Sequence, residues 1–214
     1  MALSLVQASS MDLSQDYNFT GTVTGMGTAG AMTLIKTLTA SSSSSLSFVN
    51  GSNDVVLDST YKAYKFVFKN VHPATDGVNF QFNGSTDTGS NYNVTKTTTY
   101  FDSIHREDDA GGSIQYQSAN DLAQSTSYQN LARSTDNDND SNISGELWLY
   151  NPSSSTYVKH FMNRLNHTFN STPQHTMDTF VAGYFNTTSA INAIDFKMSS
   201  GNIDDGTISL YGIS

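Results

Sequence analysis

Alternation of apolar and polar side chains with a period of two constrains this chain more than any other feature of its sequence. It is clearest in residues 62–69, where Tyr64, Phe66 and Phe68 fall on one side and lysines on the other. A β-strand sends successive side chains to opposite faces, so such a segment has one buried face and one face in water. No window shows the sustained 3.6-residue periodicity of a helix.

The same pattern recurs along most of the chain, separated by turn signals such as Asn50-Gly51 and Asn83-Gly84. About ten strands at regular spacing predict an all-β protein, either a β-sandwich or a barrel. Residues 62–69 and 78–82 are expected to pair as a hairpin or to face each other across the sandwich. Residues 102–142 are the least regular part. The strands are expected in segments 32–39, 46–49, 62–69, 78–82, 92–101, 143–150, 157–167, 180–185, 194–198 and 208–213.

Composition supports this fold class and excludes several functions. Phe (12) and Tyr (11) are abundant and fit pleated sheets, whereas disordered chains lack aromatic residues. Cysteine is absent, which removes disulfides, thiolate metal sites and thiol catalysis. The net charge is -9 with only 10 basic residues, so we expect no nucleic-acid partner and no binding to an anionic membrane.

Residues 1–31 differ from the rest, since the stretch 21–30 is rich in Gly and Thr and has little to bury. Two interpretations stay open: a frayed terminus, or an extended arm that orders on a neighbouring subunit. We therefore expect an arm at 1–31 and a single domain at 32–214. No signal peptide is recognisable at the start. The arm's candidate anchors are Leu3, Leu5, Val6, Met11 and Leu13.

Candidate catalytic and metal-binding residues are few. The acidic run Asp136–Asp140 begins like a calcium loop, but Ser141 replaces the glycine and Leu147 the glutamate of that motif. A solvated loop is the better interpretation, with a weak surface calcium site as the alternative. His160 and His167 are seven apart, on opposite faces of a strand. We expect no enzyme, no cofactor and no metal site, although a polysaccharide hydrolase with two facing carboxylates stays as a remote alternative.

The single tryptophan, Trp148, supports two interpretations. It anchors the core, as the lone tryptophan of a sandwich often does, or it forms with Tyr150 an exposed platform on which a sugar ring stacks. The second interpretation makes the protein a carbohydrate-binding module for host-surface glycans.

The C-terminal segment Ser199–Ile213 resembles a signature of virion proteins from marine tailed phages, including those of cyanobacteria. Residues 61–77, Ser144–Leu147 with Tyr150–Pro152, and 180–190 fit the same pattern. The resemblance covers about residues 32–214. It implies a non-enzymatic β-sandwich in a virion appendage, such as a head decoration, a knob, a fibre or a tail tip. It brings no catalytic or binding residues.

From this resemblance we expect an antiparallel β-sandwich, jelly-roll-like, that serves as an outer component of the phage particle. It would be assembled in the host cytoplasm and attached through the N-terminal segment. The expected partners are phage capsid or tail proteins and further copies of the same chain. Recognition of a host-surface glycan by Trp148 and Tyr150 is the alternative function. A surface rich in Ser, Thr and Asn, with only 14% charged residues, suits a particle exterior where many copies lie close together.

Overall fold

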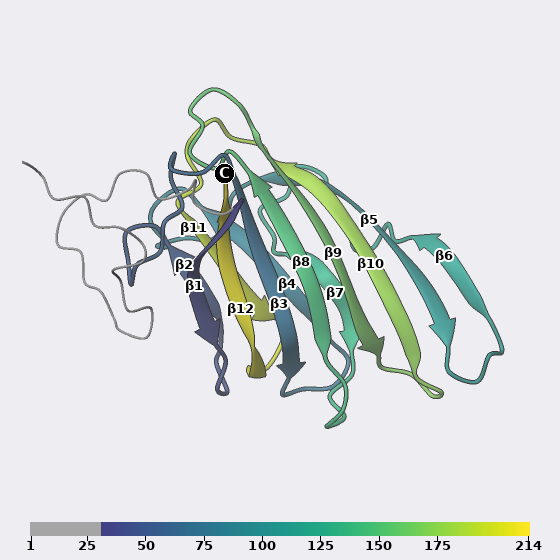
Figure 1. The fold of residues 1–214 in the computed structure, drawn as a ribbon. Coiled ribbons are helices and arrows are strands. Elements are labelled where there is room, and N and C mark those ends of the chain that lie inside the picture. Colours follow the sequence, from purple (N-terminus) through teal and green to yellow (C-terminus); the bar gives the residue numbers. More distant parts are fainter. Residues whose placement is uncertain (1–30) are drawn as a thin grey trace, which may run out of the picture.

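The computed structural model describes residues 31–214, which form an all-β domain (Figure 1). Alternating burial runs along most strands, as in β3, where Tyr64, Phe66 and Phe68 are buried. The twelve strands are β1 (Met32–Thr39), β2 (Leu46–Val49), β3 (Ala63–Pro73), β4 (Val78–Ser85), β5 (Lys96–Arg106), β6 (Gly112–Tyr116), β7 (Gln129–Thr135), β8 (Ile143–Tyr150), β9 (Lys159–Phe169), β10 (His175–Phe185), β11 (Ala193–Met198) and β12 (Ile203–Ile213).

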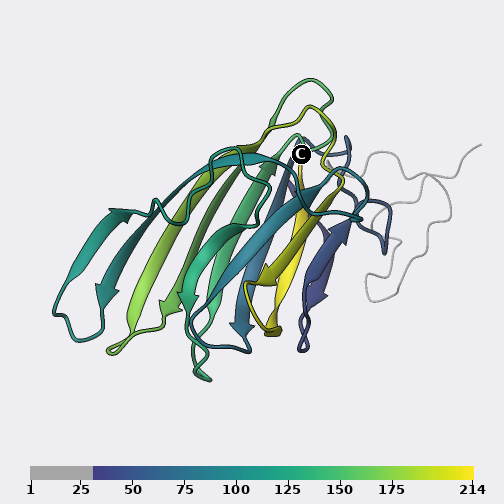
Figure 2. The ribbon, with the colours of Figure 1, turned by 180° about the vertical axis from the view of Figure 1, so that it is seen from behind.

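The strands form two layers, and all strand pairs are antiparallel. Eight strands make the larger layer, in the order β1-β12-β3-β8-β9-β10-β5-β6. Four strands, in the order β7-β4-β11-β2, make the smaller layer. A single residue pair, Thr135 with Phe169, joins the two layers. Figure 2 shows the smaller layer in front of the larger one, with β5 and β6 reaching beyond it.

The connectivity is that of a jelly roll. If the hairpins β5–β6 and β9–β10 are set aside, the remaining eight strands form two four-stranded sheets, β1-β12-β3-β8 and β2-β11-β4-β7. Numbered afresh along the chain, these are 1-8-3-6 and 2-7-4-5, the pairing of a double Greek key. The prediction of an antiparallel jelly-roll sandwich is therefore confirmed. The two inserted hairpins lie side by side and double the width of one sheet.

Aromatic rings fill the space between the two layers. Phe196 on β11 lies at the centre, with its ring 5.2 Å from that of Phe66 and 5.3 Å from that of Phe68. Phe80 and Phe82 of β4 stack beside it at 6.0 and 6.3 Å. Each of these rings is almost completely buried, and edge-to-face packing adds to the hydrophobic stabilisation.

The structure decides one open alternative and corrects one expectation. Strands β3 and β4 face each other across the sandwich, as the second alternative predicted, and meet through Phe68 and Phe80, 5.2 Å apart. Residues 102–142 hold more regular structure than expected, because β5 continues to Arg106 and β6 and β7 follow. Their pattern is weak because β6 is almost wholly exposed and β7 buries polar side chains such as Gln129 and Thr135.

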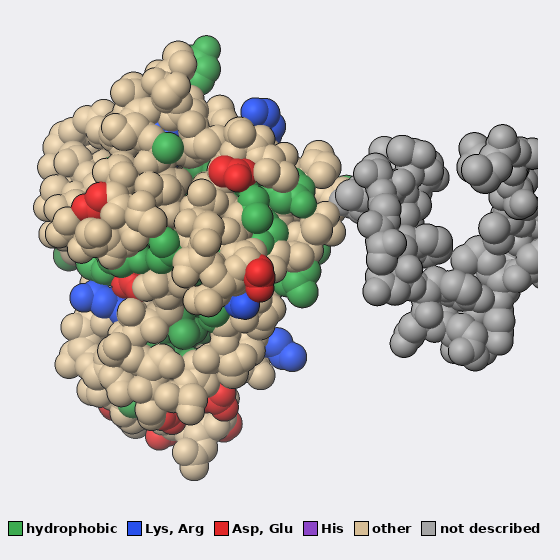
Figure 3. All heavy atoms as spheres, turned by 90° about the vertical axis from the view of Figure 1, so that its left-hand side faces the viewer, with side chains coloured by type: hydrophobic (Ala, Val, Ile, Leu, Met, Phe, Trp, Pro, Cys, Tyr) green, Lys and Arg blue, Asp and Glu red, His purple; other side chains and the backbone are tan. Residues whose placement is uncertain are grey.

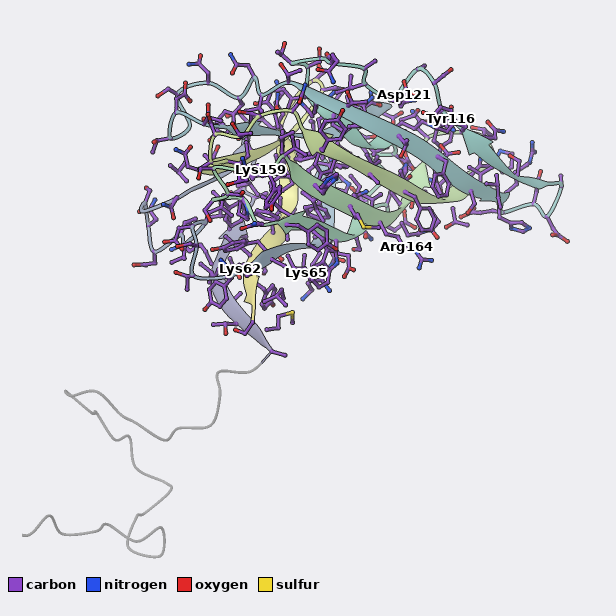
Figure 4. All side chains as sticks on the ribbon, turned by 90° about the horizontal axis from the view of Figure 1, so that it is seen from above. Lys62, Lys65, Tyr116, Asp121, Lys159 and Arg164 are labelled. Atoms are coloured by element: carbon purple, nitrogen blue, oxygen red, sulfur yellow. The ribbon has the colours of Figure 1, made fainter. Side chains whose placement is uncertain are left out.

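The interior against which β5, β9 and β10 pack contains several polar side chains among the hydrophobic ones. Asp102 on β5 is fully buried and accepts a hydrogen bond from Arg133 Nε at 2.8 Å. His167 on β9 is also buried, and its Nε2 donates to the carbonyl of Arg133 at 3.0 Å. Two lysines, Lys96 and Lys159, lie opposite Phe185 on either side and have no exposed surface. Figure 4 places Lys159 between the two layers.

Candidate binding face

Trp148 and Tyr150 lie on the outer face of the eight-stranded layer, not in the core. Their neighbours on β8, Leu147 and Leu149, point inward and are fully buried. Trp148 is half-buried and Tyr150 is 37% exposed. Their rings are nearly parallel, at 12°, with centroids 6.3 Å apart. The interpretation of Trp148 as a core anchor is therefore wrong, because alternation along β8 places it on the side that no second layer covers.

Two charged neighbours, Glu146 on β8 itself and Lys65 on β3, hold Trp148 in place. Its indole N–H donates to Glu146 Oε1 at 2.8 Å, and the ammonium of Lys65 lies 5.0 Å from the ring centroid. Lys65 also forms an ion pair with Glu146. Burial raises the pKa of Glu146, but the hydrogen bonds from Lys65 and Trp148 outweigh it and hold the pKa below its ordinary value. Each polar group at the edge of the indole is thus satisfied.

A second aromatic group forms a stack across three neighbouring strands. Arg164 on β9, Phe180 on β10 and Phe101 on β5 are directly opposite one another in the strand register. The guanidinium lies 4.9 Å from the Phe180 ring, and the two phenyl rings are 4.8 Å apart at 4°. These spacings match the distance between strands, about 4.8 Å. Arg164 also donates to Asp178 at 2.9 Å, so its guanidinium is fixed on two sides.

Between the two aromatic groups lies a shallow trough of about 460 Å³. Small residues form its floor, since Ala182 and Thr99 are the outward residues of β10 and β5 there. Larger side chains border it, among them Tyr150, Met162 and Tyr184. Its lining is mostly apolar, which favours an apolar or ring-shaped group over a highly charged ligand.

Exposed hydrophobic side chains gather on this face. Within residues 31–214, eight large hydrophobic residues are exposed, and all but Tyr157 belong to the outer face of the eight-stranded layer, as the strand register shows. Met162 is 55% exposed at its centre. Figure 3, viewed from the β1 edge, shows hydrophobic side chains along the right-hand margin, which belongs to this face, and mostly uncharged polar surface elsewhere. Besides Met162, six exposed hydrophobic residues belong to this face: Met32, Leu34, Phe101, Ile114, Tyr116 and Tyr150.

Lysines and carboxylates on this face nearly balance. Lys65, Lys69 and Arg164 point outward from β3 and β9, against Glu146 on β8 and Asp178 on β10. Lys65 and Arg164 project from the same side of the sheet (Figure 4). The whole chain carries -9, so most of its negative charge lies elsewhere.

The other candidate residues from the sequence are not joined to this face. Leu3, Leu5, Val6, Met11 and Leu13 lie outside the described residues. The acidic loop lines a polar hollow near Asp76, but the Asp136 carboxylate already accepts hydrogen bonds from Ser141 and Gln174. Within residues 31–214, no cluster of three His, Asp or Glu side chains could hold a metal ion. His160 is exposed and His167 buried, on opposite faces of β9 as expected.

Sequence reasoning found Trp148 and Tyr150 but missed Phe101, Met162 and Phe180. Phe180 falls in a compact apolar segment in which both faces are hydrophobic, so the alternation gives no signal for which face is exposed. Phe101 ends a Thr-rich segment, and only the register of β5 with β10 places it beside Phe180. A cross-strand contact of this kind has no local sequence signature.

Comparison with known proteins identifies no family. No family model matches the chain, and no curated protein or solved structure matches it significantly. Among the residues that the structure describes, there is no helix of the length and hydrophobicity needed to cross a membrane.

Proposed function

We propose that the chain is a non-enzymatic structural protein of a tailed-phage particle, forming an outer appendage or decoration of the head or tail. The observation that supports this most is a jelly roll whose larger sheet leaves a broad apolar face open. Jelly rolls recur in viral capsid and lectin domains, and a face of this kind serves contact with another macromolecule. The likeness of Ser199–Ile213 to a virion signature supports the same function.

Attachment is assigned to the N-terminal segment in this proposal. Five apolar residues near the start of this segment are the candidate anchors on a capsid or tail protein: Leu3, Leu5, Val6, Met11 and Leu13. Extended segments bind partners by adding a strand or filling a groove.

Immunogold labelling of purified particles with an antibody against this chain tests the proposal. Label on the head indicates a decoration or knob, and label confined to the tail indicates a fibre or tail-tip component. A full-length chain with Leu5→Asp and Val6→Asp should no longer co-sediment with particles. The control variant Tyr157→Asp, on the exposed loop between β8 and β9, should still co-sediment. Chain found only free in the lysate would refute the virion assignment.

Glycan recognition is the second candidate function, and the trough beside Tyr150 favours it. Parallel aromatic rings next to an apolar hollow suit the apolar side of a sugar ring. Trp148→Ala should then abolish binding on an array of bacterial surface glycans, whereas Tyr157→Ala should leave it unchanged. Absence of binding by the wild-type chain would remove this candidate.

A further inference from the structure

We infer that the outer face of the eight-stranded layer is the surface on which a second copy of this chain docks, face to face. The inference uses the same apolar face that supports the virion proposal, but its test does not depend on that proposal, because it concerns only how two copies meet. It rests on the width of the face, on the distribution of its hydrophobic side chains and on the order of its charges.

The area of the face is sufficient for a stable dimer. Eight strands about 4.8 Å apart and four rows of outward residues about 7 Å apart give on the order of 700–1,000 Å² per copy. A standard stable interface buries about 800 Å² on each partner. Of the exposed hydrophobic residues on this face, only Tyr150 and Met162 line the trough, so a small ligand bound there would leave the others uncovered.

Hydrophobic residues lie at both ends of the face and charged ones near its middle. Met32 and Leu34 belong to β1 at one edge, and Ile114 and Tyr116 belong to β6 at the other. The midline runs between β8 and β9, with four strands on each side. A two-fold axis along this midline would place β6 of one copy over β1 of the other, so the two apolar ends would cover each other.

The order of charges selects the same axis. From β3 to β10 the charged groups alternate in sign: Lys65, Glu146, Arg164 and Asp178. A two-fold axis parallel to the strands reverses this order in the second copy, so Arg164 of each copy faces Glu146 of the other, because these two residues lie opposite each other in the register. An axis across the strands would place like charges together, which opposes association. With a net charge of -9, copies should repel one another at their other surfaces.

The side chains at this interface are already ordered in the single chain. Arg164, Phe180 and Phe101 form one stack, and Trp148 is held by Lys65 and Glu146. Association therefore costs little side-chain entropy, because these rotamers are fixed before binding. The dimer would cover Trp148, Tyr150 and the trough, so dimer formation and glycan binding exclude each other on this face.

The mass of the full chain in solution tests the inference, measured by light scattering after size exclusion. We expect twice the 23.2 kDa of one chain at about 100 µM protein. Met162→Asp, close to the proposed axis, should give a monomer or weaken association at least tenfold. Tyr157→Asp is the matched control, since Tyr157 is 70% exposed but lies off the face, and it should stay dimeric. Circular dichroism checks that both variants fold.

Charge exchange tests the orientation. Arg164→Glu should separate the copies, because a glutamate at position 164 would then face Glu146 of the other copy. Adding Glu146→Arg should restore the dimer, because an arginine and a glutamate again face each other, with their positions exchanged. Because the chain has no cysteine, Met162→Cys gives one thiol per chain, which a short bismaleimide should link within the dimer; Tyr157→Cys should not cross-link.

Three results would overturn the inference. A wild-type chain that is monomeric at 100 µM refutes the second copy as occupant, and glycan binding that depends on Trp148 in that monomer would assign the face to a sugar instead. Equal effects of Met162→Asp and Tyr157→Asp would place the interface elsewhere. Failure of Glu146→Arg to rescue Arg164→Glu would refute the two-fold arrangement.

Discussion

Replacing Lys96 by methionine should stabilise the protein. The side chain has no exposed surface, and its ammonium donates only to Asn83 Oδ1 at 2.8 Å and to the carbonyl of Val94 at 3.2 Å. None of the carboxylates in residues 31–214 forms an ion pair with it. Burial lowers the pKa of Lys96 from 10.5 to about 7. Methionine fills a similar volume without a charge that needs solvation.

The size of the effect follows from this pKa. Each pKa unit corresponds to about 1.4 kcal/mol, so keeping the amine buried costs about 4 kcal/mol at pH 7. Loss of the two hydrogen bonds offsets about 2 kcal/mol of this. Asn83 Oδ1 keeps one donor, the backbone N–H of Gly84 at 2.9 Å. We therefore expect Lys96→Met to stabilise the protein by about 2 kcal/mol at pH 7, or to raise Tm by about 4–8 °C.

The dependence on pH separates this cause from a simple gain in packing. Above pH 7 the native Lys96 is mostly neutral, whereas in the unfolded chain the amine keeps its proton up to about pH 10.4. The unfolded state then binds the extra proton, so the wild-type stability contributed by this group rises by about 1.4 kcal/mol per pH unit between pH 7 and 10. The stabilisation of about 2 kcal/mol at pH 7 should therefore disappear by about pH 9, and it should change little below pH 7.

Urea unfolding at pH 6, 7.5 and 9, followed by circular dichroism at one fixed protein concentration, measures these differences. Lys69→Met is the matched control, because Lys69 is exposed and should show no such pH dependence. A stability difference between Lys96→Met and wild type that does not change with pH would refute the reasoning. So would a variant that is less stable than wild type at pH 6.

Three further predictions concern the polar interior and the close approach of strands. Arg133→Ala should destabilise the protein by about 3–5 kcal/mol in urea unfolding, because it leaves the buried Asp102 without its cation; an effect below about 1 kcal/mol would contradict this. Burial lowers the pKa of His167 to about 4. Between pH 6.5 and 4 the unfolded chain therefore binds a proton at this residue that the native state does not bind, and the stability should fall by up to about 3 kcal/mol. His167→Gln should make that loss shallower, and an unchanged acid profile would argue against it. Gly206→Ala should lower stability by about 1–3 kcal/mol in thermal unfolding, since Gly206 has φ +105° and a Cβ there would overlap the carbonyl of Asn70, whereas at Gly51 the space is open and the loss should be smaller.

Lys159 shows what the sequence pattern alone does not predict. Alternation in residues 157–167 separates Phe161 and Leu165 from His160 and Met162, and that division is correct. It also places Lys159 on the same side as Phe161, and only the fold shows that this side is buried. A charged lysine side chain favours an exposed position. Lys159 is nevertheless buried, because it lies on the same face of β9 as Phe161 and Leu165.

The sequence by itself determined the fold class, because a period of two in many short segments permits only strands, and aromatic side chains on one side of them require a second layer. The jelly-roll-like connectivity is expected from the virion resemblance rather than from the strand pattern, and the pairing of β1, β12, β3 and β8 confirms it. Only the tertiary structure decided which face stays uncovered. The smaller layer has four strands and the larger has eight, so the second layer lies against one face only, and local alternation carries no information on which face that is. The cross-strand stack of Arg164, Phe180 and Phe101 depends on register between segments far apart in the chain, and register is a property of the assembled sheet.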